Sequence, residues 1–256
     1  MSRPRSVQLE AFLTWVGGMV LLAGRSLRSL LTERLEWRTL LVQLDRVGVR
    51  SLSIVLLTAS FTGMVVALQT AYALERFGAK HVVGLVVAQS LVREMGPVLT
   101  ALLVGGRVGA GITAELASMS VTEQVDAMVA LGASPVQRLI VPRMLAVLLM
   151  MPLLTIVAIG VGLFGGLAVA VLDLRQPASA YWQSCFEGTE VADLLSGLGK
   201  SIFFAAAVAL IACYNGLSAR GGAGGVGSAT TRTVLALSIV VLISNFFLTK
   251  LFLFLG

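Results

Sequence analysis

The sequence is poor in charged residues. Only 12% of its 256 residues are Asp, Glu, Lys or Arg, whereas soluble globular domains average roughly 25%. Hydrophobic residues make up 57% of the chain, and the mean hydropathy is +0.93. Because so few charges cannot cover a soluble protein of this size, the composition excludes a soluble globular domain and predicts an integral membrane protein.

Histidine and cysteine are scarce as well. His81 is the single histidine, and Cys185 and Cys213 are the only cysteines. With no second histidine and no CxxC pair, we expect no metal site. We expect Cys185 in an outer loop and Cys213 in a span, which argues against a disulfide. The isolated His81 also lacks the partner motif of an intramembrane hydrolase.

Long stretches without charge predict the membrane-crossing helices. Four such runs approach or exceed the roughly 20 residues that a helix needs to cross the hydrocarbon core. They are Ser51–Leu74, Met144–Leu172, Ser201–Ala219 and Thr233–Thr249, with 24, 29, 19 and 17 residues. A fifth span, Val82–Arg107, follows if Arg93 and Glu94 are tolerated inside it. We therefore predict an all-α membrane domain of five spans over residues 51–256.

The formal net charge of +6 is a topology signal. Of the nineteen Lys and Arg residues, eight precede the first span, three follow the second and two follow the fourth, whereas the opposite connections hold three. By the positive-inside rule, the N-terminus is cytoplasmic and the C-terminus lies outside. This distribution argues against nucleic-acid binding.

Residues 1–50 are predicted to form a cytoplasmic and interfacial segment. An amphipathic helix at the membrane interface is expected there, with arginines reaching the headgroups. Its side chains expected in lipid are Phe12, Trp15, Val16 and Met19. A sixth crossing is the alternative.

Arg93 and Glu94 are candidate functional residues because they lie inside the second span. An ionisable side chain at a helix centre costs roughly 2.5–3.5 kcal/mol on insertion scales, so such residues normally face a bundle interior or a wet cavity. A mutual ion pair that only holds helices together is the structural alternative. Lys200, at the outer start of the fourth span, either snorkels to the headgroups or faces an anionic headgroup together with Arg93.

A short cytoplasmic helix is predicted between the second and third spans. Ser120 and Glu123 have the spacing of a capping box, and Gly132 is a natural C-terminal stop, which together predict a helix over Val121–Leu131. Ser134–Pro135 then starts the next helix. Such a helix suits docking of a cytoplasmic partner; the alternative is a solvated loop.

The glycine-rich segment Arg220–Arg232 contains a formal G-x-G-x-x-G match that begins at Gly222. No strand precedes it and no Lys-Ser/Thr completes a P-loop, so we do not interpret it as a nucleotide site. We expect a flexible inner connection whose Ser228, Thr230 and Thr231 cap the fifth helix. Energy for active transport would therefore come from a partner or an ion gradient.

The segment Thr122–Ala146 resembles the E-x-x-D-A-x-x-x-L-G-x-x-P-x-x-x-L-x-x-P-R signature of the MlaE-type permease family. These are membrane subunits of lipid-transporting ABC systems that work with MCE proteins. The likeness extends over Arg93–Met119 and Gly221–Val234 and covers the chain from Arg50 onward. The matching signature positions are Glu123, Asp126, Ala127, Leu131, Gly132, Pro135, Leu139, Pro142 and Arg143.

The resemblance implies an interfacial helix followed by five spans, in agreement with the count reached from the apolar runs when Arg93 and Glu94 are tolerated. It also implies a homodimer in the bacterial inner membrane with a periplasmic C-terminus, two cytoplasmic ATPase subunits, an outer MCE protein and a small STAS-domain accessory protein. The ATPase would bind ATP and Mg²⁺, so no cofactor is expected in this chain. At Asn245 we would expect an aspartate in many relatives. The implied ATPase-contact residues are Glu123, Asp126, Leu131, Gly132 and Pro135.

Together these observations predict a phospholipid-translocating permease. A dimer cavity lined by spans one, two and five would hold acyl chains, while Arg93, Glu94 and Lys200 meet the headgroup through charge-assisted bonds. An ion-gradient-driven carrier of an amphiphile is the alternative, since the same three residues suit ion coupling.

Overall fold

The computed structural model describes residues 5–32, 36–75 and 78–255. Within these ranges the chain is helical and contains no β-strand. Five stretches are long and apolar enough to cross a membrane. They are Trp37–Glu75, Val83–Val121, Val136–Leu172, Val191–Leu217 and Gly222–Phe252. The prediction of an all-α membrane protein with five spans is confirmed.

The first span begins earlier than its charge-free run. It consists of α2 (Trp37–Leu44), the π-helical turn η1 (Asp45–Val49) and α3 (Arg50–Glu75). The helix passes through Arg50 without a break, because charge marks the end of an apolar run but does not by itself end a helix. The span is therefore longer than its predicted apolar part.

The second span is interrupted by two π-helical turns, which locally shift the helix faces and often occur at functional sites. The first of these turns contains Arg93 and Glu94. After the short 3₁₀ turn η2 (Lys80–Val82), the segments are α4 (Val83–Ser90), η3 (Leu91–Met95), α5 (Gly96–Val104), η4 (Gly105–Gly109) and α6 (Ala110–Val121).

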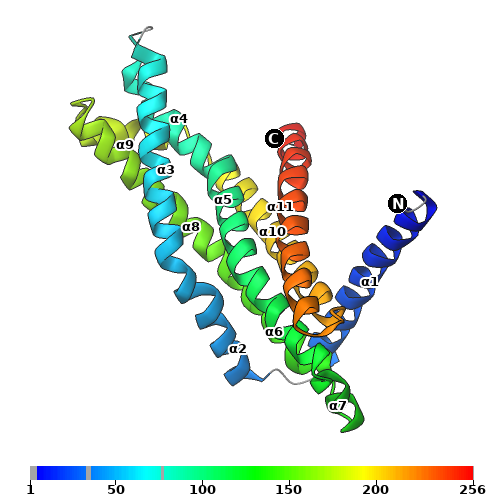
Figure 1. Cartoon of the computed structure of the whole chain (residues 1–256). Coiled ribbons are helices and arrows are strands. Elements are labelled where there is room, and N and C mark those ends of the chain that lie inside the picture. The colour runs from blue at the N-terminus through cyan, green and yellow to red at the C-terminus, as the bar shows by residue number, and fades with distance from the viewer. Residues whose placement is uncertain (1–4, 33–35, 76–77, 256) are drawn as a thin grey trace.

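The remaining spans follow a short helix, α7, which lies at the lower tip of the molecule in Figure 1. This helix is the predicted cytoplasmic element between spans two and three. The elements from here to the end are α7 (Gln124–Ala130), η5 (Val136–Ile140), α8 (Val141–Leu172), α9 (Ala178–Glu187), α10 (Val191–Leu217) and α11 (Gly222–Leu255).

The largest group of buried apolar side chains lies where α6, α8 and α10 meet. Leu116, Met151, Phe204 and Val208 are all fully buried in it. Because lipid is as apolar as these side chains, close packing rather than escape from water favours their contact inside a membrane.

Small residues let α3 and α8 run side by side along the bundle (Figure 1). A Cβ atom added at Gly63 would lie 1.8 Å from the Gly162 carbonyl oxygen, and one added at Gly165 would lie 2.3 Å from the Ser60 carbonyl oxygen. No side chain fits in either place, so the two backbones are in direct contact.

From the sequence, the outer connection between spans three and four is expected to be a loop with Tyr181 and Trp182 as interfacial anchors, but it contains α9. Tyr181 is fully buried instead, and its hydroxyl donates to the Leu163 carbonyl at 3.3 Å. Cys185 is also buried, and its thiol donates to the Gly84 carbonyl at 3.2 Å. Both residues belong to the packing between α9, α4 and α8, so the anchor role predicted for Tyr181 is wrong.

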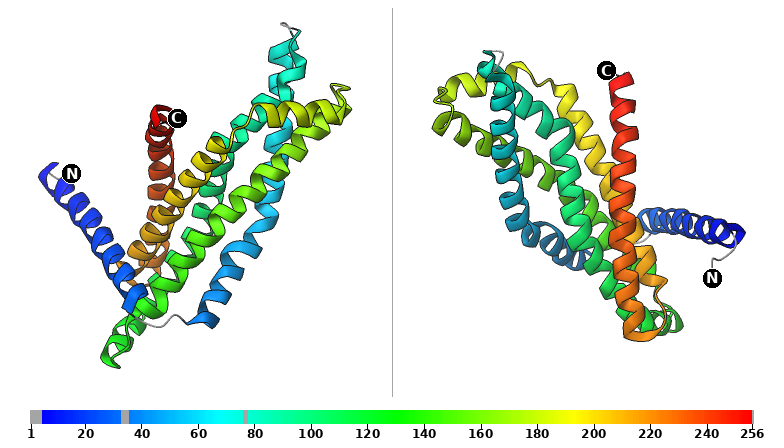
Figure 2. Two further views of the ribbon diagram at one scale, coloured as in Figure 1. Left: turned by 180° about the vertical axis from the view of Figure 1, so that it is seen from behind. Right: turned by 45° about the horizontal axis from the view of Figure 1, so that its top comes forward.

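The N-terminal helix α1 (Arg5–Thr32) diverges from the bundle (Figures 1 and 2). It is not among the candidate spans of the described residues. Trp15 Nε1 donates to Asn215 Oδ1 of α10 at 2.9 Å, and Met19 packs against the core, so these two side chains do not face lipid as predicted. A buried indole N–H requires an acceptor, and Asn215 supplies it. Val16 is also partly covered, whereas the side chain of Phe12 lies outside the described residues.

The predicted flexible connection before the fifth span is largely helical. Only residues 218–221 separate α10 from α11. The hydroxyls of Ser228, Thr230 and Thr231 donate to carbonyls three or four residues earlier inside α11. They do not cap the helix, because it begins six residues before Ser228.

Candidate functional site

A cavity of about 640 Å³ lies where α4, η3, α10 and α11 meet, toward the end of the bundle opposite α7. Five of its lining residues are charged. They are Arg93, Glu94, Glu190, Asp193 and Lys200. The structure thus brings together the three predicted headgroup residues and adds two acids. Its walls come from spans two, four and five.

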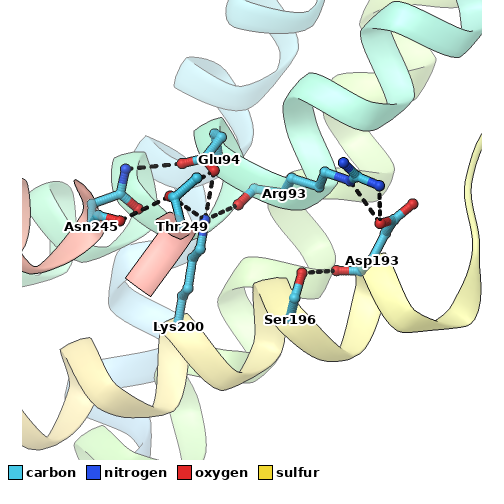
Figure 3. Close-up of polar contacts among 7 residues, drawn as sticks. All are labelled: Arg93, Glu94, Asp193, Ser196, Lys200, Asn245 and Thr249. Atoms are coloured by element: carbon cyan, nitrogen blue, oxygen red, sulfur yellow. Dashed lines mark hydrogen bonds and ion pairs between the residues drawn. The ribbon is translucent and has the colours of Figure 1, made fainter. Parts of the chain in front are cut away.

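Lys200 is buried and points into the bundle (Figure 3). Its Nζ lies 2.6 Å from Glu94 Oε1 and donates to Thr249 Oγ1 and to the Arg93 carbonyl, both at 2.8 Å. All three ammonium donors are therefore satisfied. The prediction that Lys200 snorkels to the headgroups is wrong, because these acceptors make the buried position favourable.

The Arg93 carbonyl in η3 is available to Lys200 because of a nearby proline. Pro97 has no backbone N–H and cannot donate to the carbonyl four residues earlier, which is that of Arg93. This carbonyl accepts from Lys200 instead. The proline therefore helps to create a polar position inside an apolar span.

Glu94 connects three elements. Its Oε1 accepts from Lys200 on α10 and lies 2.8 Å from Thr249 Oγ1 on α11, while its Oε2 accepts from Asn245 Nδ2 at 2.9 Å. Asn245 faces the bundle, as predicted. Its Oδ1 is buried without a hydrogen-bond partner in the described part of the chain.

Arg93 pairs with Asp193, which sequence reasoning did not identify. Its Nε and Nη2 lie 2.6 and 2.5 Å from Asp193 Oδ1 (Figure 3). The alternative of a mutual Arg93–Glu94 pair is wrong, because consecutive helical residues do not face each other.

A sequence signal for Asp193 existed. Glu190 and Asp193 form a capping box at the start of α10, in which the Glu190 N–H donates to Asp193 Oδ2 at 3.1 Å. Asp193 also lies seven residues before Lys200, two helical turns away on one face of α10. Reading this spacing would have placed both side chains toward the same cavity.

The predicted helix α7 begins differently from expectation. Glu123 has a positive φ of 59°, and the Ser120 hydroxyl donates to the Leu217 carbonyl at 3.1 Å, so the predicted capping box is absent. The C-terminal prediction is confirmed: Gly132 has φ 76°, and the Ala133 N–H donates to the Met128 carbonyl at 2.9 Å, as in a Schellman motif.

The predicted partner-docking residues lie on an exposed surface. Of the residues of α7, none is buried, and Leu131 just beyond it is 86% exposed. Glu123, Asp126 and Pro135 line a hollow of about 600 Å³ beside this helix. Ser134 and Pro135 begin the next helix as predicted, with the Ser134 hydroxyl accepting from the Gln137 N–H at 3.4 Å.

A second cluster of charges joins the ends of three spans near α7. Glu115 of α6 accepts from Arg46 of η1 at 2.7 Å and from Arg143 of α8 at 2.9 Å. The Arg143 side chain is only 9% exposed, and its Nη1 also donates to the Leu139 carbonyl at 2.7 Å. Glu115 therefore ties spans one, two and three together.

Comparison with known proteins gives consistent matches over most of the chain. The family model described as Permease MlaE matches residues 40–251. A probable ABC transporter permease of Rickettsia typhi is 41% identical over 236 residues, covering 92% of this chain and 91% of the relative. The intermembrane phospholipid transport system permease protein MlaE of Haemophilus influenzae is 40% identical over 219 residues, covering 85% and 84%. A probable ABC transporter permease of Synechocystis is 40% identical over 230 residues, covering 90% and 88%.

Proposed function

This chain belongs to the MlaE permease family, and from that premise we propose that it is the membrane-spanning subunit of an ABC transporter that moves phospholipids. The chain itself is a permease rather than a catalytic subunit. ATP and Mg²⁺ are bound by a partner ATPase.

The observation that carries this proposal is a charged cavity directly beside an apolar hollow. The cavity of about 640 Å³ holds Arg93 and Lys200. The neighbouring hollow of about 430 Å³ has a mostly apolar surface, formed by Leu242 and Phe246 of α11 together with Asn245 and Lys250. Glu94 and Thr249 line both spaces. A charged compartment joined to an apolar one matches the two parts of a phospholipid.

Headgroup binding uses the accessible side of Arg93. Asp193 engages two of the five guanidinium N–H donors, and the side chain is 40% exposed. The remaining donors can bind a phosphate through charge-assisted bonds. Lys200 already has three acceptors, so it reaches a phosphate only when it releases one of them.

The conformational change that ATP hydrolysis drives in the ATPase is transmitted to the cavity through α7. The exposed docking surface of Glu123, Asp126, Leu131, Gly132 and Pro135 contacts the ATPase subunit. Glu115 lies six residues before Val121, the end of α6, and connects the ends of three spans, so a push on α7 is passed to them together. The spans then change between two packings.

A second copy of the chain completes the transporter. Along α11, large apolar side chains spaced by four residues and outside the hollow are more than half exposed: Leu235, Ile239 and Ile243. Such a stripe suits contact with the same helix of a partner protomer. In this arrangement the protein lies in the bacterial inner membrane with a cytoplasmic N-terminus and a periplasmic C-terminus. An MCE-domain protein contacts its outer side, and a STAS-domain protein accompanies the ATPase.

The test compares Arg93→Ala with Arg175→Ala, which removes an exposed cation of the outer connection. Transporters carrying each variant are purified with their co-purifying subunits and reconstituted, and fluorescent-phospholipid transfer is measured. We expect Arg93→Ala to assemble but to transfer lipid at least tenfold more slowly, with Arg175→Ala unchanged. Assembly with normal transfer in Arg93→Ala would contradict headgroup binding at this cavity.

The alternative of an ion-gradient-driven carrier is tested on the same vesicles. An ABC permease requires ATP and continues to transfer lipid after an ionophore has collapsed the proton and sodium gradients. Lipid transfer that the ionophore abolishes, and whose rate is the same with and without ATP, would favour the carrier.

A further inference from the structure

The charges of the cavity wall do not cancel. Glu94, Glu190 and Asp193 contribute three negative charges, whereas Arg93 and Lys200 contribute two positive charges, so the wall carries a net charge of −1. Lys250 lines the adjoining apolar hollow but not this cavity.

Two ion pairs neutralise four of these five charges and leave one carboxylate without a cation. Lys200 and Glu94 neutralise each other at 2.6 Å. Arg93 is neutralised by Asp193, which is itself buried and held by the Glu190 N–H. The carboxylate of Glu190 accepts from the Asp193 N–H in the capping box, but neither cation of the cavity wall is paired with it, so its charge remains at the exposed edge of the cavity.

A phosphate that binds here meets an arginine whose positive charge is already balanced. An anionic headgroup would therefore bring a second uncompensated negative charge into the cavity. A headgroup with an ammonium group places that cation next to the carboxylates while its phosphate takes the accessible N–H groups of Arg93. Asp193 and Lys200 are buried, and charges at buried positions are screened less than at an open surface, so charge balance weighs more here.

We propose that Asp193 sets the headgroup preference of the transporter, so that the cavity selects zwitterionic phospholipids with an ammonium headgroup over anionic phospholipids. This inference rests on the proposed phospholipid transport.

The test uses two substitutions with opposite expected effects. Asp193→Asn keeps the shape of the side chain, releases Arg93 and brings the wall to zero charge. Arg93→Gln brings it to −2. The double variant Arg93→Gln/Asp193→Asn returns to −1. Glu187→Gln, which removes an exposed acid of α9 outside the cavity, is the matched control.

Each full-length variant is purified with its co-purifying subunits from membranes that contain phosphatidylethanolamine and phosphatidylglycerol. The two bound lipids are quantified by mass spectrometry against the bulk membrane. We expect the unmodified protein to be enriched in phosphatidylethanolamine. Asp193→Asn should shift the ratio at least threefold toward phosphatidylglycerol, and Arg93→Gln should shift it the other way.

The double variant should move the ratio back toward the original one because its wall charge is restored, whereas Glu187→Gln should retain the original ratio. If Asp193→Asn cannot be purified, Arg93→Gln alone decides by the direction of its shift. Bound phospholipid with the same ratio in all variants would overturn the assignment of Asp193 but leave phospholipid transport standing. A complete lack of bound phospholipid in the unmodified protein would instead count against the proposed function itself.

Discussion

Lys200 of α10 and Glu94 of η3 form a buried ion pair with 2.6 Å between Nζ and Oε1, although 106 positions separate them in the chain. Only 2% of the lysine side chain is exposed, against 36% for the glutamate. The pair thus lies at the boundary between packed protein and cavity, with the lysine on the packed side and the glutamate accessible from the cavity.

Removing one partner of this pair should destabilise the protein. A buried charge without its partner costs about 3 kcal/mol or more. We therefore expect Glu94→Ala to lower the melting temperature clearly, whereas Glu94→Gln/Lys200→Met should recover most of the loss because neither residue then carries a charge. Thermal unfolding in detergent, followed by size-exclusion chromatography, measures both. Equal loss in the single and double variants would show that the pair does not couple.

The Glu115 cluster should contribute more to the stability of the fold than an exposed ion pair of the same type. Glu115→Ala leaves the buried Arg143 guanidinium without its carboxylate, which costs about 3 kcal/mol. Asp45→Ala removes a carboxylate from a pair whose side chains are 51% and 62% exposed, and such pairs contribute about 1 kcal/mol or less. We expect the melting temperature to fall only for Glu115→Ala. A similar fall in both variants would argue against a joining role for Glu115.

The exposed end of α7 should be needed for ATPase binding. Leu131 is 86% exposed and Leu172, at the far end of α8, is 77% exposed, which makes them a matched pair. We expect Leu131→Ser to reduce co-purification of the ATPase at least fivefold without loss of the permease, and Leu172→Ser to leave it intact. If the amount of co-purified ATPase is unchanged by Leu131→Ser, the docking surface must lie elsewhere.

The Cys185 thiol should be inert in the folded protein. Burial raises its pKa to about 11 from the usual 9.0, so the reactive thiolate is nearly absent at pH 7.5. In a Cys213→Ala background, we expect maleimide labelling only after denaturation. A cysteine introduced at the exposed neighbour, as Phe186→Cys in a Cys185→Ala/Cys213→Ala background, should react without denaturation.

The same shift predicts a pH dependence of stability. The folded protein keeps the thiol proton up to about pH 11, whereas an unfolded thiol loses it near 9.0. The stabilisation is therefore fully present below pH 9 and is lost as the pH rises toward 11. Cys185→Ala should reduce the fall in melting temperature between pH 9 and pH 11. An identical fall in the variant and the unmodified protein would show that Cys185 does not cause it.

The spans and α7 were predictable because their signals are local. Charge-free runs identified four crossings, and tolerating Arg93 and Glu94 gave the fifth. Gly132 identified the end of α7 through a backbone conformation that glycine favours. The first residues of the first span and of α7 were predicted less well. A capping box requires the side chain of Ser120 to turn to its own helix, but the Leu217 carbonyl on α10 offered a better acceptor.

The candidate site was predictable only in part. Arg93 and Glu94 were identified as costly charges, yet their partners come from residues about 100 or more positions away, which no local pattern encodes. Asn245 illustrates this point. An aspartate was expected there in relatives, but in this chain its amide donates to the Glu94 carboxylate, and an ionised aspartate has no N–H to donate.

The direct backbone contact between α3 and α8 limits how this transporter can move. At Gly63 and Gly165 the two helices leave no room for even a methyl group, so sliding or rotating one past the other would produce immediate collisions. These two helices must therefore travel as one rigid body. Any transport cycle that repacks the spans would then have to do so at the contacts of other helices, such as those of α11 with α6 and α10.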